Sequence, residues 1–114
     1  KYGEQKRDYI YVKDVVRANM LAASAMTSCI LNCGTGHPTT FNRLIEILNE
    51  VFGCKRHPEY IDNPYAGNYQ EHTECDMTLA QKQLGFTPHY SIEDGIEDYF
   101  KIGCMMQPVQ RGAR

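Results

Sequence analysis

Tyr9 and Lys13 are the two side chains in this sequence whose types and spacing most directly suggest catalysis. They lie four residues apart in the stretch RDYIYVKD, residues 7–14. A lysine ammonium beside a phenol lowers the phenol's pKa, so that the phenolate can exchange a proton with an alcohol during hydride transfer. On a helix, residues four apart rise about 6 Å and share one face. On a strand they lie about 13 Å apart.

The residues around this pair favour a strand. Residues 8–12, DYIYV, are aromatic or β-branched apart from Asp8, and this composition is typical of strands. We therefore predict a strand over 8–12 and a helix over 15–26 that Asp14 caps. This geometry keeps Tyr9 and Lys13 apart, so we assign no catalytic residue in this chain.

The sequence GTG at 34–36 is a second signal that suggests a nucleotide site. It follows a short apolar run, CILNC at 29–33, which we predict to be a buried strand, and it precedes a helix, as a dinucleotide-binding loop would. The third glycine is missing, and no acidic residue ends a following strand in the expected place. A strand-to-helix turn that needs glycine's backbone freedom is the favoured interpretation, so we assign no cofactor-binding residue.

Capping residues and helical periodicity predict three more helices, together with a strand at 57–61 and an irregular segment at 62–75. The first begins at Thr39 or Thr40 and runs to about Phe52, before Gly53. The second runs from Asp76 to Gly85, and the third begins at Ser91, where Asp94 completes a near capping box. Their predicted inner faces are Phe41, Leu44, Ile45, Leu48 and Phe52 in the first helix, and Ile92, Ile96, Tyr99 and Phe100 in the last.

Composition limits the kinds of partner. The 114 residues are 42% hydrophobic with a net charge of −2, which indicates neither disorder nor a nucleic-acid-binding surface. No apolar run approaches the roughly 18 residues of a membrane span. The five cysteines include no Cys-x-x-Cys pair, which predicts reduced thiols in a cytoplasmic protein. His72 and Cys75 have a spacing suited to zinc, but no second pair completes the ligand set, so we predict no metal site.

Three motifs, in the same order, carry a resemblance to a known family: RDYIYVKDVVRAN, ILNCGTG, and NYQEHTECDMTLAQKQLGFTPHYSIEDGIEDYF. From about Gly3 to Phe100 the chain resembles the C-terminal third of the extended short-chain dehydrogenases that act as nucleotide-sugar epimerases and dehydratases. The resemblance implies an α/β fold: the C-terminal part of a Rossmann-type epimerase, helix-rich with a few short strands and incomplete as a domain. Residues 1–102 would form the substrate-binding portion, and residues 103–114 a flexible tail.

Within that family, the loop most resembles the ADP-glycero-manno-heptose 6-epimerases, which carry a Tyr-Gln-x-x-Thr-x-x-Asp pattern. Tyr69, Gln70, Thr73 and Asp76 are the matching positions. UDP-glucose and UDP-galactose 4-epimerases more often carry an Arg and an Asp in this loop, and the sequence has no Arg between 56 and 111. The implied substrate is an ADP- or UDP-linked sugar. A UDP-glucose 4-epimerase or a sugar dehydratase remains an alternative parent.

The resemblance also implies roles for single residues. Arg7 matches an arginine that reaches the substrate's diphosphate, a task suited to a planar, permanently charged, bidentate donor. Tyr9 matches an aromatic on the same strand face that points toward the nucleotide. Tyr69 matches a loop tyrosine that contacts the nucleotide sugar, with Gln70 and Asn68 as its neighbours.

Structural roles for these residues remain open. Arg7 could form a surface salt bridge to Glu4 or Asp14, and Tyr69 could pack within its loop. The four histidines, at positions 37, 57, 72 and 89, are interpreted as structural or solvated.

The absences lead to further expectations. The family's glycine-rich cofactor loop, catalytic Ser or Thr and helical Tyr-x-x-x-Lys have no counterpart here, and the sequence begins at Lys1. We therefore expect a catalytically inactive fragment of a longer enzyme, with NAD or NADP bound by the full-length parent and not by this chain. The alternative is a stand-alone binding or interaction module without catalysis. A fragment would also self-associate through exposed apolar surface.

Overall fold

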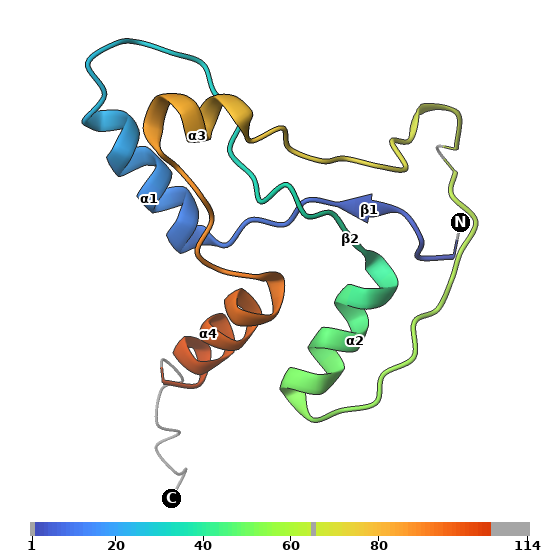
Figure 1. The fold of residues 1–114 in the computed structure, drawn as a ribbon. Helices are drawn as coiled ribbons and strands as arrows, with labels where there is room; N and C mark the ends of the chain where they lie inside the picture. Colours follow the sequence, from blue (N-terminus) through green and yellow to red (C-terminus); the bar gives the residue numbers. More distant parts are fainter. Residues whose placement is uncertain (1, 65, 106–114) are drawn as a thin grey trace, which may run out of the picture.

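The computed structural model describes residues 2–64 and 66–105, and this part of the chain contains four α-helices and a two-stranded sheet (Figure 1). The elements follow the order β1 (Lys6–Arg7), α1 (Val12–Ala23), β2 (Thr39–Thr40), α2 (Phe41–Phe52), a 3-10 helix (Ala66–Asn68), α3 (Thr78–Leu84) and α4 (Ile92–Met105). The helix-rich α/β fold with a few short strands that the sequence predicted is confirmed.

Strand β1 lies between two other segments and connects distant parts of the chain. It pairs with β2 in antiparallel register, Lys6 opposite Thr40 and Arg7 opposite Thr39. On its other side the Lys6 N–H donates to the Glu71 carbonyl at 2.8 Å, and the Thr73 N–H donates to the Lys6 carbonyl at 3.2 Å. The loop after the 3-10 helix is thereby fixed next to β1.

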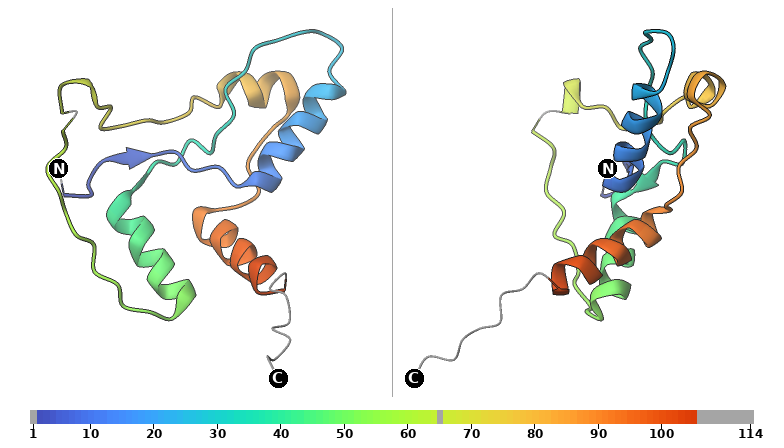
Figure 2. Two further views of the ribbon diagram at one scale, coloured as in Figure 1. Left: turned by 180° about the vertical axis from the view of Figure 1, so that it is seen from behind. Right: turned by 90° about the vertical axis from the view of Figure 1, so that its left-hand side faces the viewer.

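The helices pack in two pairs (Figure 2). Between α1 and α3 lies a cluster of four buried apolar residues: Ala18, Met77, Ala80 and Phe86. The Arg17 guanidinium carbon lies 4.9 Å from the centroid of the Phe86 ring and covers it. Helices α2 and α4 meet at the Phe52 and Phe100 rings, whose centroids are 4.8 Å apart.

Asp14 connects the two pairs. Its side chain, 1% exposed, lies in the first turn of α1. The His89 N–H donates to both carboxylate oxygens at 3.0 Å, the Tyr90 N–H donates to Oδ2 at 3.0 Å, and Arg17 donates to Oδ1 at 3.2 Å. Burial opposes ionisation, but these donors together outweigh it and hold the Asp14 pKa below its ordinary value. The start of α1 is thus fixed to the α3–α4 connection.

The predicted limits of α2, the end of α3 and the start of α4 are confirmed, whereas α1 ends at Ala23 rather than at residue 26 and α3 begins at Thr78 rather than at Asp76. The Thr40 hydroxyl accepts a backbone N–H from the first turn of α2 at 3.0 Å. Gly53 and Gly85 end α2 and α3 in the left-handed conformation, both with φ of 62°, where glycine is favoured. The Ser91 hydroxyl accepts the Asp94 N–H at 3.0 Å, and the Asp94 carboxylate accepts the Ser91 hydroxyl at 2.6 Å, which completes the capping arrangement.

The predicted strand over 8–12 and the predicted cap at Asp14 are wrong. The strand is shorter and earlier, at Lys6–Arg7, and α1 already begins at Val12 after Tyr11. Asp14 therefore lies inside the helix, and its carboxylate accepts N–H groups from residues 75 and 76 positions away instead of its own helix. Local capping rules could not reveal this long-range partner.

The strands predicted at 29–33 and 57–61 are also absent from the part of the chain that the structure describes. Ile30 is 98% exposed and Ile61 81% exposed. A β-forming sequence becomes a strand only when a neighbour supplies hydrogen bonds, and neither segment has such a neighbour among the described residues. Helix α4 extends to Met105, so the predicted tail begins later than Gly103, and residues 106–114 lie outside the described residues.

A large share of the apolar surface is open to solvent. Buried hydrophobic residues are few among those described: Ala18, Ile47, Met77, Ala80 and Phe86. This agrees with the expectation of a fold that is incomplete as a domain. No helix in the described part is long and apolar enough to cross a membrane.

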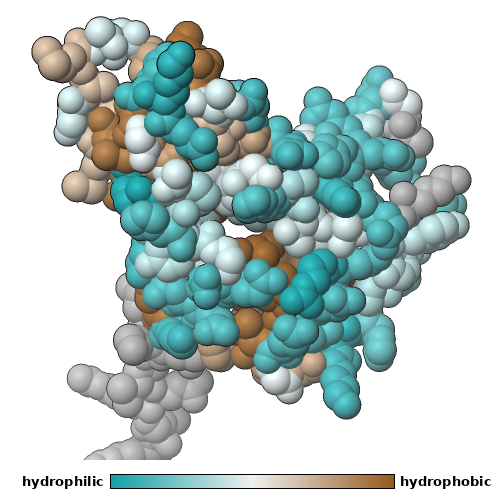
Figure 3. All heavy atoms as spheres, viewed as in Figure 1, coloured by the Kyte–Doolittle hydropathy of each residue, from teal (hydrophilic) through white to brown (hydrophobic). Residues whose placement is uncertain are grey.

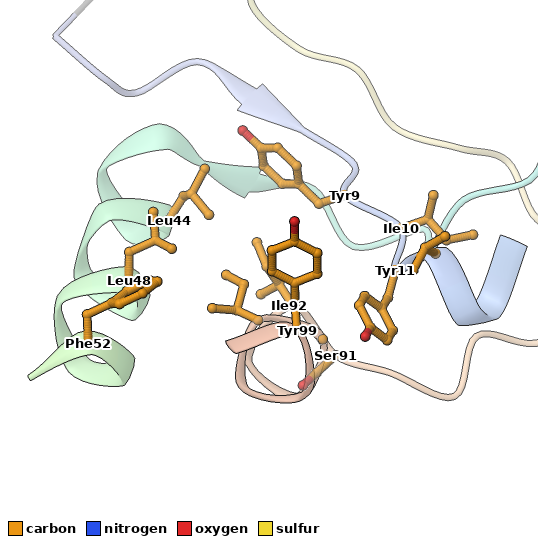
Figure 4. Close-up of a pocket in the computed structure, with 12 residues that line it drawn as sticks. Tyr9, Ile10, Tyr11, Leu44, Leu48, Phe52, Ser91, Ile92 and Tyr99 are labelled. Atoms are coloured by element: carbon orange, nitrogen blue, oxygen red, sulfur yellow. The ribbon is translucent and has the colours of Figure 1, made fainter. Parts of the chain in front are cut away.

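An apolar groove of about 360 Å³ lies between α2, α4 and residues 9–12 (Figure 4). Predicted inner-face residues line it instead of being covered, and Phe52 and Tyr99 are 53% and 70% exposed. Brown apolar side chains are visible inside this hollow, within a teal rim (Figure 3). We call this feature the α2–α4 groove; its lining includes Tyr9, Leu44, Leu48, Phe52, Ile92, Ile96 and Tyr99.

Replacing Asp14 by Asn should lower the free energy of unfolding by about 2–4 kcal/mol, because an amide nitrogen would face backbone N–H donors. Since the native pKa lies below the ordinary value, the wild-type carboxylate contributes fully above pH of about 4–5 and loses its contribution as pH falls through the native pKa. Urea unfolding at neutral and acidic pH measures both effects. The exposed Asp62→Asn variant is the control and should match wild type at neutral pH, and equal stability of Asp14→Asn would contradict the assignment.

Two glycines of α4 provide a matched comparison. A Cβ at Gly95 would lie 3.1 Å from three atoms of the Tyr11 side chain, whereas a Cβ at Gly103 would meet nothing within 4 Å. Gly103→Ala should stabilise the protein by up to about 1 kcal/mol through helix propensity. Gly95→Ala should be at least about 1 kcal/mol less stable than Gly103→Ala, because Tyr11 must move. Thermal unfolding compares the two, and equal stability would show that α4 does not pack on Tyr11.

Candidate functional site

Arg7 and Tyr69 come together although they lie far apart in the sequence. The Arg7 guanidinium carbon is 5.0 Å from the centroid of the Tyr69 ring, a cation–π arrangement. Its Nη2 donates to the Gln70 carbonyl at 2.6 Å and its Nη1 to the Lys6 carbonyl at 2.7 Å. The pairing of β1 with residues 71–73 brings the loop to this position.

Tyr9 lies next to this pair. Its ring meets Phe41 edge-on, with centroids 6.4 Å apart, and its hydroxyl is buried without a hydrogen-bond partner among the described residues. In Figure 4 the hydroxyl points away from Ile92 and toward the side of β1. Burial raises the Tyr9 pKa, while the nearby positive charge of Arg7 acts in the opposite direction.

The two remaining predicted site residues occupy the same loop in different ways. Gln70 contributes its backbone carbonyl to Arg7, and its side chain is exposed. Asn68 is exposed at the end of the 3-10 helix, directly before Tyr69. We call Arg7, Tyr9, Tyr69, Gln70 and Asn68 the Arg7 cluster.

The alternative roles weighed for Arg7 are not those seen. Glu4 accepts a hydrogen bond from the Asn42 amide at 2.6 Å, and Asp14 pairs with Arg17. Arg7 instead lies over Tyr69 and bonds only to carbonyl oxygens in the contacts described. Its charge is therefore not neutralised by either of these carboxylates.

Lys13 does not activate Tyr9. Its Nζ lies 2.6 Å from Asp98 Oδ2, and the Tyr11 hydroxyl donates to the same oxygen at 2.6 Å. The hydrogen bond to Asp98 raises the pKa of Tyr11, so this phenol holds its proton more firmly than usual. The phenol near Lys13 is therefore that of Tyr11, and its pKa is raised, whereas a catalytic phenolate requires a lowered pKa.

The GTG turn does not fit a dinucleotide's pyrophosphate. The backbone N–H groups of Thr35 and Gly36 donate to the Asp8 carboxylate at 2.9 and 2.8 Å, and the Cys75 N–H donates to it at 3.1 Å. The Thr35 hydroxyl also donates to Asp8. Although burial acts to raise the Asp8 pKa, these donors lower it overall. The donors that would hold a phosphate are already occupied by a carboxylate, which would also repel it.

Sequence reasoning did not identify Asp8 as an organising residue. The available signal was a single acidic residue within an otherwise apolar, β-forming stretch that precedes two glycines by about 27 positions.

For the zinc alternative, His72 Nε2 lies 3.0 Å from Glu74. No group of three or more His, Cys, Asp or Glu side chains in the described part could hold a metal ion.

Comparisons with known proteins agree on one class of enzyme. The chain is 36% identical to the UDP-glucose 4-epimerase of Thermotoga maritima, crystallised with UDP-glucose, with a TM-score of 0.80 over 91% of this chain and 34% of that one. It is 35% identical to the ADP-L-glycero-D-manno-heptose-6-epimerase of Alkalilimnicola ehrlichii over 85% of this chain and 31% of that protein. MoeE5, solved with UDP-glucuronic acid and NAD, is 31% identical, with a TM-score of 0.77 over 89% of this chain and 35% of its own.

No protein-family model matches the chain. The chain spans about 30% of the length of the curated relatives it matches. The motifs, the fold and these similarities together identify the chain as a homologue of the nucleotide-sugar epimerases of the extended short-chain dehydrogenase family, corresponding to about one third of their length.

Proposed function

We propose that this chain is the nucleotide-sugar-binding portion of an NAD(P)-dependent nucleotide-sugar epimerase. The observation that carries the proposal is the Arg7 guanidinium stacked on Tyr69 beside the buried Tyr9 hydroxyl. A positive charge, an aromatic face and a polar group within one cluster match the diphosphate, ring and hydroxyl chemistry of a nucleotide sugar.

Arg7 is suited to a diphosphate because its orientation is already fixed. A guanidinium carries five N–H donors, and the two described bonds to the Lys6 and Gln70 carbonyls use Nη1 and Nη2 once each. Further N–H groups remain for phosphate oxygens. Stacking on Tyr69 reduces the side-chain entropy that binding would otherwise cost.

The identity of the sugar nucleotide is the finer part of the proposal. An ADP-linked heptose is the first candidate, from the Tyr69-Gln70-x-x-Thr73-x-x-Asp76 pattern and the similarity to heptose epimerases. Thr73 and Asp76 have their contacts away from the Arg7 guanidinium: the Thr73 N–H bonds to β1, and Asp76 accepts the Thr78 N–H at 2.9 Å. Recognition then depends on Tyr69 and Gln70. A UDP-linked sugar is the alternative, supported by the Thermotoga maritima enzyme.

Catalysis requires groups that lie elsewhere in a parent enzyme. Asp98 binds both Lys13 and Tyr11 here, and the GTG donors are occupied by Asp8. We therefore propose that this chain contributes substrate binding, that NAD or NADP is held by another part of the parent, and that the chain alone does not turn over substrate.

Titration of the ¹⁵N-labelled protein with ADP, UDP and their sugar conjugates tests this assignment. We expect weak binding, with backbone shift changes concentrated at Arg7 and residues 68–71. Arg7→Ala should weaken binding by roughly tenfold or more, since it removes a charge-assisted phosphate contact. The control is Arg56→Ala, an exposed arginine outside the cluster, which should bind like wild type. Shift changes centred away from the Arg7 cluster, or equal affinities of the two variants, would contradict the proposal.

A second role for the chain, as an interaction surface, is supported by the α2–α4 groove. Exposed Val12, Val16 and Met20 form a stripe at helical spacing on α1 that adjoins the groove at Val12. An uncovered apolar surface of this kind is typical of a protein contact. We propose that it mediates self-association of this chain.

Analytical ultracentrifugation over a range of concentrations tests self-association. Tyr99→Glu would place a charge at the groove and should lower the association constant about tenfold or more. Met26→Glu is the matched control, because Met26 is fully exposed, at 100%, but lies in the loop after α1. A wild-type protein that stays monomeric at high concentration, or a Met26→Glu effect as large as that of Tyr99→Glu, would rule out this surface.

A further inference from the structure

Cys33 and Cys75 lie in two chain segments that come into close contact. The segment before β2 crosses the segment before α3 (Figures 1 and 2), and the two are in contact at Gly34 and Cys75. Cys33 and Cys75 line the same surface pocket, together with Asp8 and Asn32. Both are free thiols in the structure, and Cys33 is exposed while Cys75 is half-buried.

The surroundings of Gly34 show how close the two chain segments are. A Cβ on Gly34 would lie 2.4 Å from the Cβ of Cys75 and 2.9 Å from its Sγ, distances that only a residue without a side chain allows. Adjacent Cα atoms are about 3.8 Å apart. The Cα atoms of Cys33 and Cys75 are therefore separated by at most about 9 Å, whereas a disulfide needs about 4.4–6.8 Å, so a shift of the 24–38 loop would close any remaining gap.

Asp8 holds the two segments together. Its carboxylate accepts the N–H groups of Thr35 and Gly36 on one side and of Cys75 on the other. The two thiols consequently stay near one another in the folded chain, and the effective concentration of one at the other is high.

We propose that Cys33 and Cys75 are a dithiol site that forms an intramolecular disulfide by exchange with a small-molecule disulfide such as oxidised glutathione. The exposed Cys33 thiolate attacks one glutathione sulfur and releases the first glutathione thiolate, leaving a mixed disulfide. The Cys75 thiolate then attacks the Cys33 sulfur and releases the second. Two protein thiols are oxidised, one glutathione disulfide is reduced to two thiols, and the two thiol protons pass to solvent and the departing thiolates.

The surroundings explain why the pair also persists as thiols. Partial desolvation by neighbouring atoms raises the pKa of the exposed Cys33 thiol, as do the charges of Asp14 and Asp8, while Arg17 acts in the opposite direction. Burial also raises the pKa of Cys75, with Asp8, Cys33 and Asp76 adding to the effect. A raised pKa leaves less thiolate at neutral pH, so exchange is slow there and accelerates as pH rises.

Two further cysteines, Cys29 and Cys54, serve as internal controls. Cys54 follows α2, where its thiol donates to the Asn49 side-chain oxygen at 3.2 Å. Cys29 is exposed in the loop after α1. Neither lines the pocket shared by Cys33 and Cys75.

Incubating the folded protein with oxidised glutathione at mildly alkaline pH, trapping with an alkylating agent and mapping the peptides by mass spectrometry tests the proposal. The expected product links Cys33 to Cys75 and has lost the mass of two hydrogen atoms. Cys33→Ser and Cys75→Ser should each stop at a glutathione adduct on the remaining cysteine, whereas Cys54→Ser should still form the bond. The disulfide should raise the melting temperature by roughly 5 °C or more, because it closes a long loop of the unfolded chain.

The peptide map of the wild-type protein is decisive even where a variant folds poorly. A mixed disulfide on Cys33 that never resolves would overturn the proposal, as would preferential pairing with Cys29, Cys54 or Cys104. Unchanged thiols at equilibrium would overturn it as well. This inference does not depend on nucleotide-sugar binding, because it follows from the positions of the two thiols and from thiol–disulfide exchange.

Discussion

The fold depends on two aspartates whose carboxylates accept backbone N–H groups from distant segments. Asp8 binds the turn at Thr35 and Gly36 and the N–H of Cys75, and Asp14 binds the connection between α3 and α4 at His89 and Tyr90. The sheet has two strands of two residues each and supplies few hydrogen bonds. These carboxylates therefore provide many of the hydrogen bonds that fix one segment to another. A buried carboxylate that accepts several N–H groups stabilises a fold only while all the donors remain in place.

This arrangement positions the Arg7 cluster. Arg7 and Asp8 are consecutive, so the same short extended segment carries a residue that faces the loop at 69–71 and a residue that fixes the turn at 34–36. The extension of β1 by residues 71–73 then sets Tyr69 over the Arg7 guanidinium. The orientation of Arg7 thus follows from backbone pairing, and its side-chain partners are carbonyl oxygens and a ring rather than an acid.

Sequence patterns predicted the helices well because the signals are local. The Thr40 cap, the left-handed Gly53 and Gly85, and the Ser91–Asp94 pair each act within one turn. The strands were harder, since CILNC and HPEYI have β-forming residues but no neighbour to pair with in the described chain. Asp14 illustrates the same limit: its position before an apolar run suggested a cap, while its backbone N–H donors lie more than seventy residues away. The Arg7 cluster was predicted through a resemblance; its contact with Tyr69 depends on strand pairing that no local pattern encodes.

The Asp8 carboxylate also occupies the anion-binding face of the turn at residues 34–36. Two backbone N–H groups that converge from a Gly-x-Gly turn form a concave anion receptor, and here the receptor carries its own permanent anion from the same chain. The acceptor for these N–H groups is therefore a residue about 27 positions upstream of the turn. Exchange of Asp8 for a neutral residue would therefore leave these N–H groups without their acceptor and loosen the contact between residues 34–36 and the segment before α3.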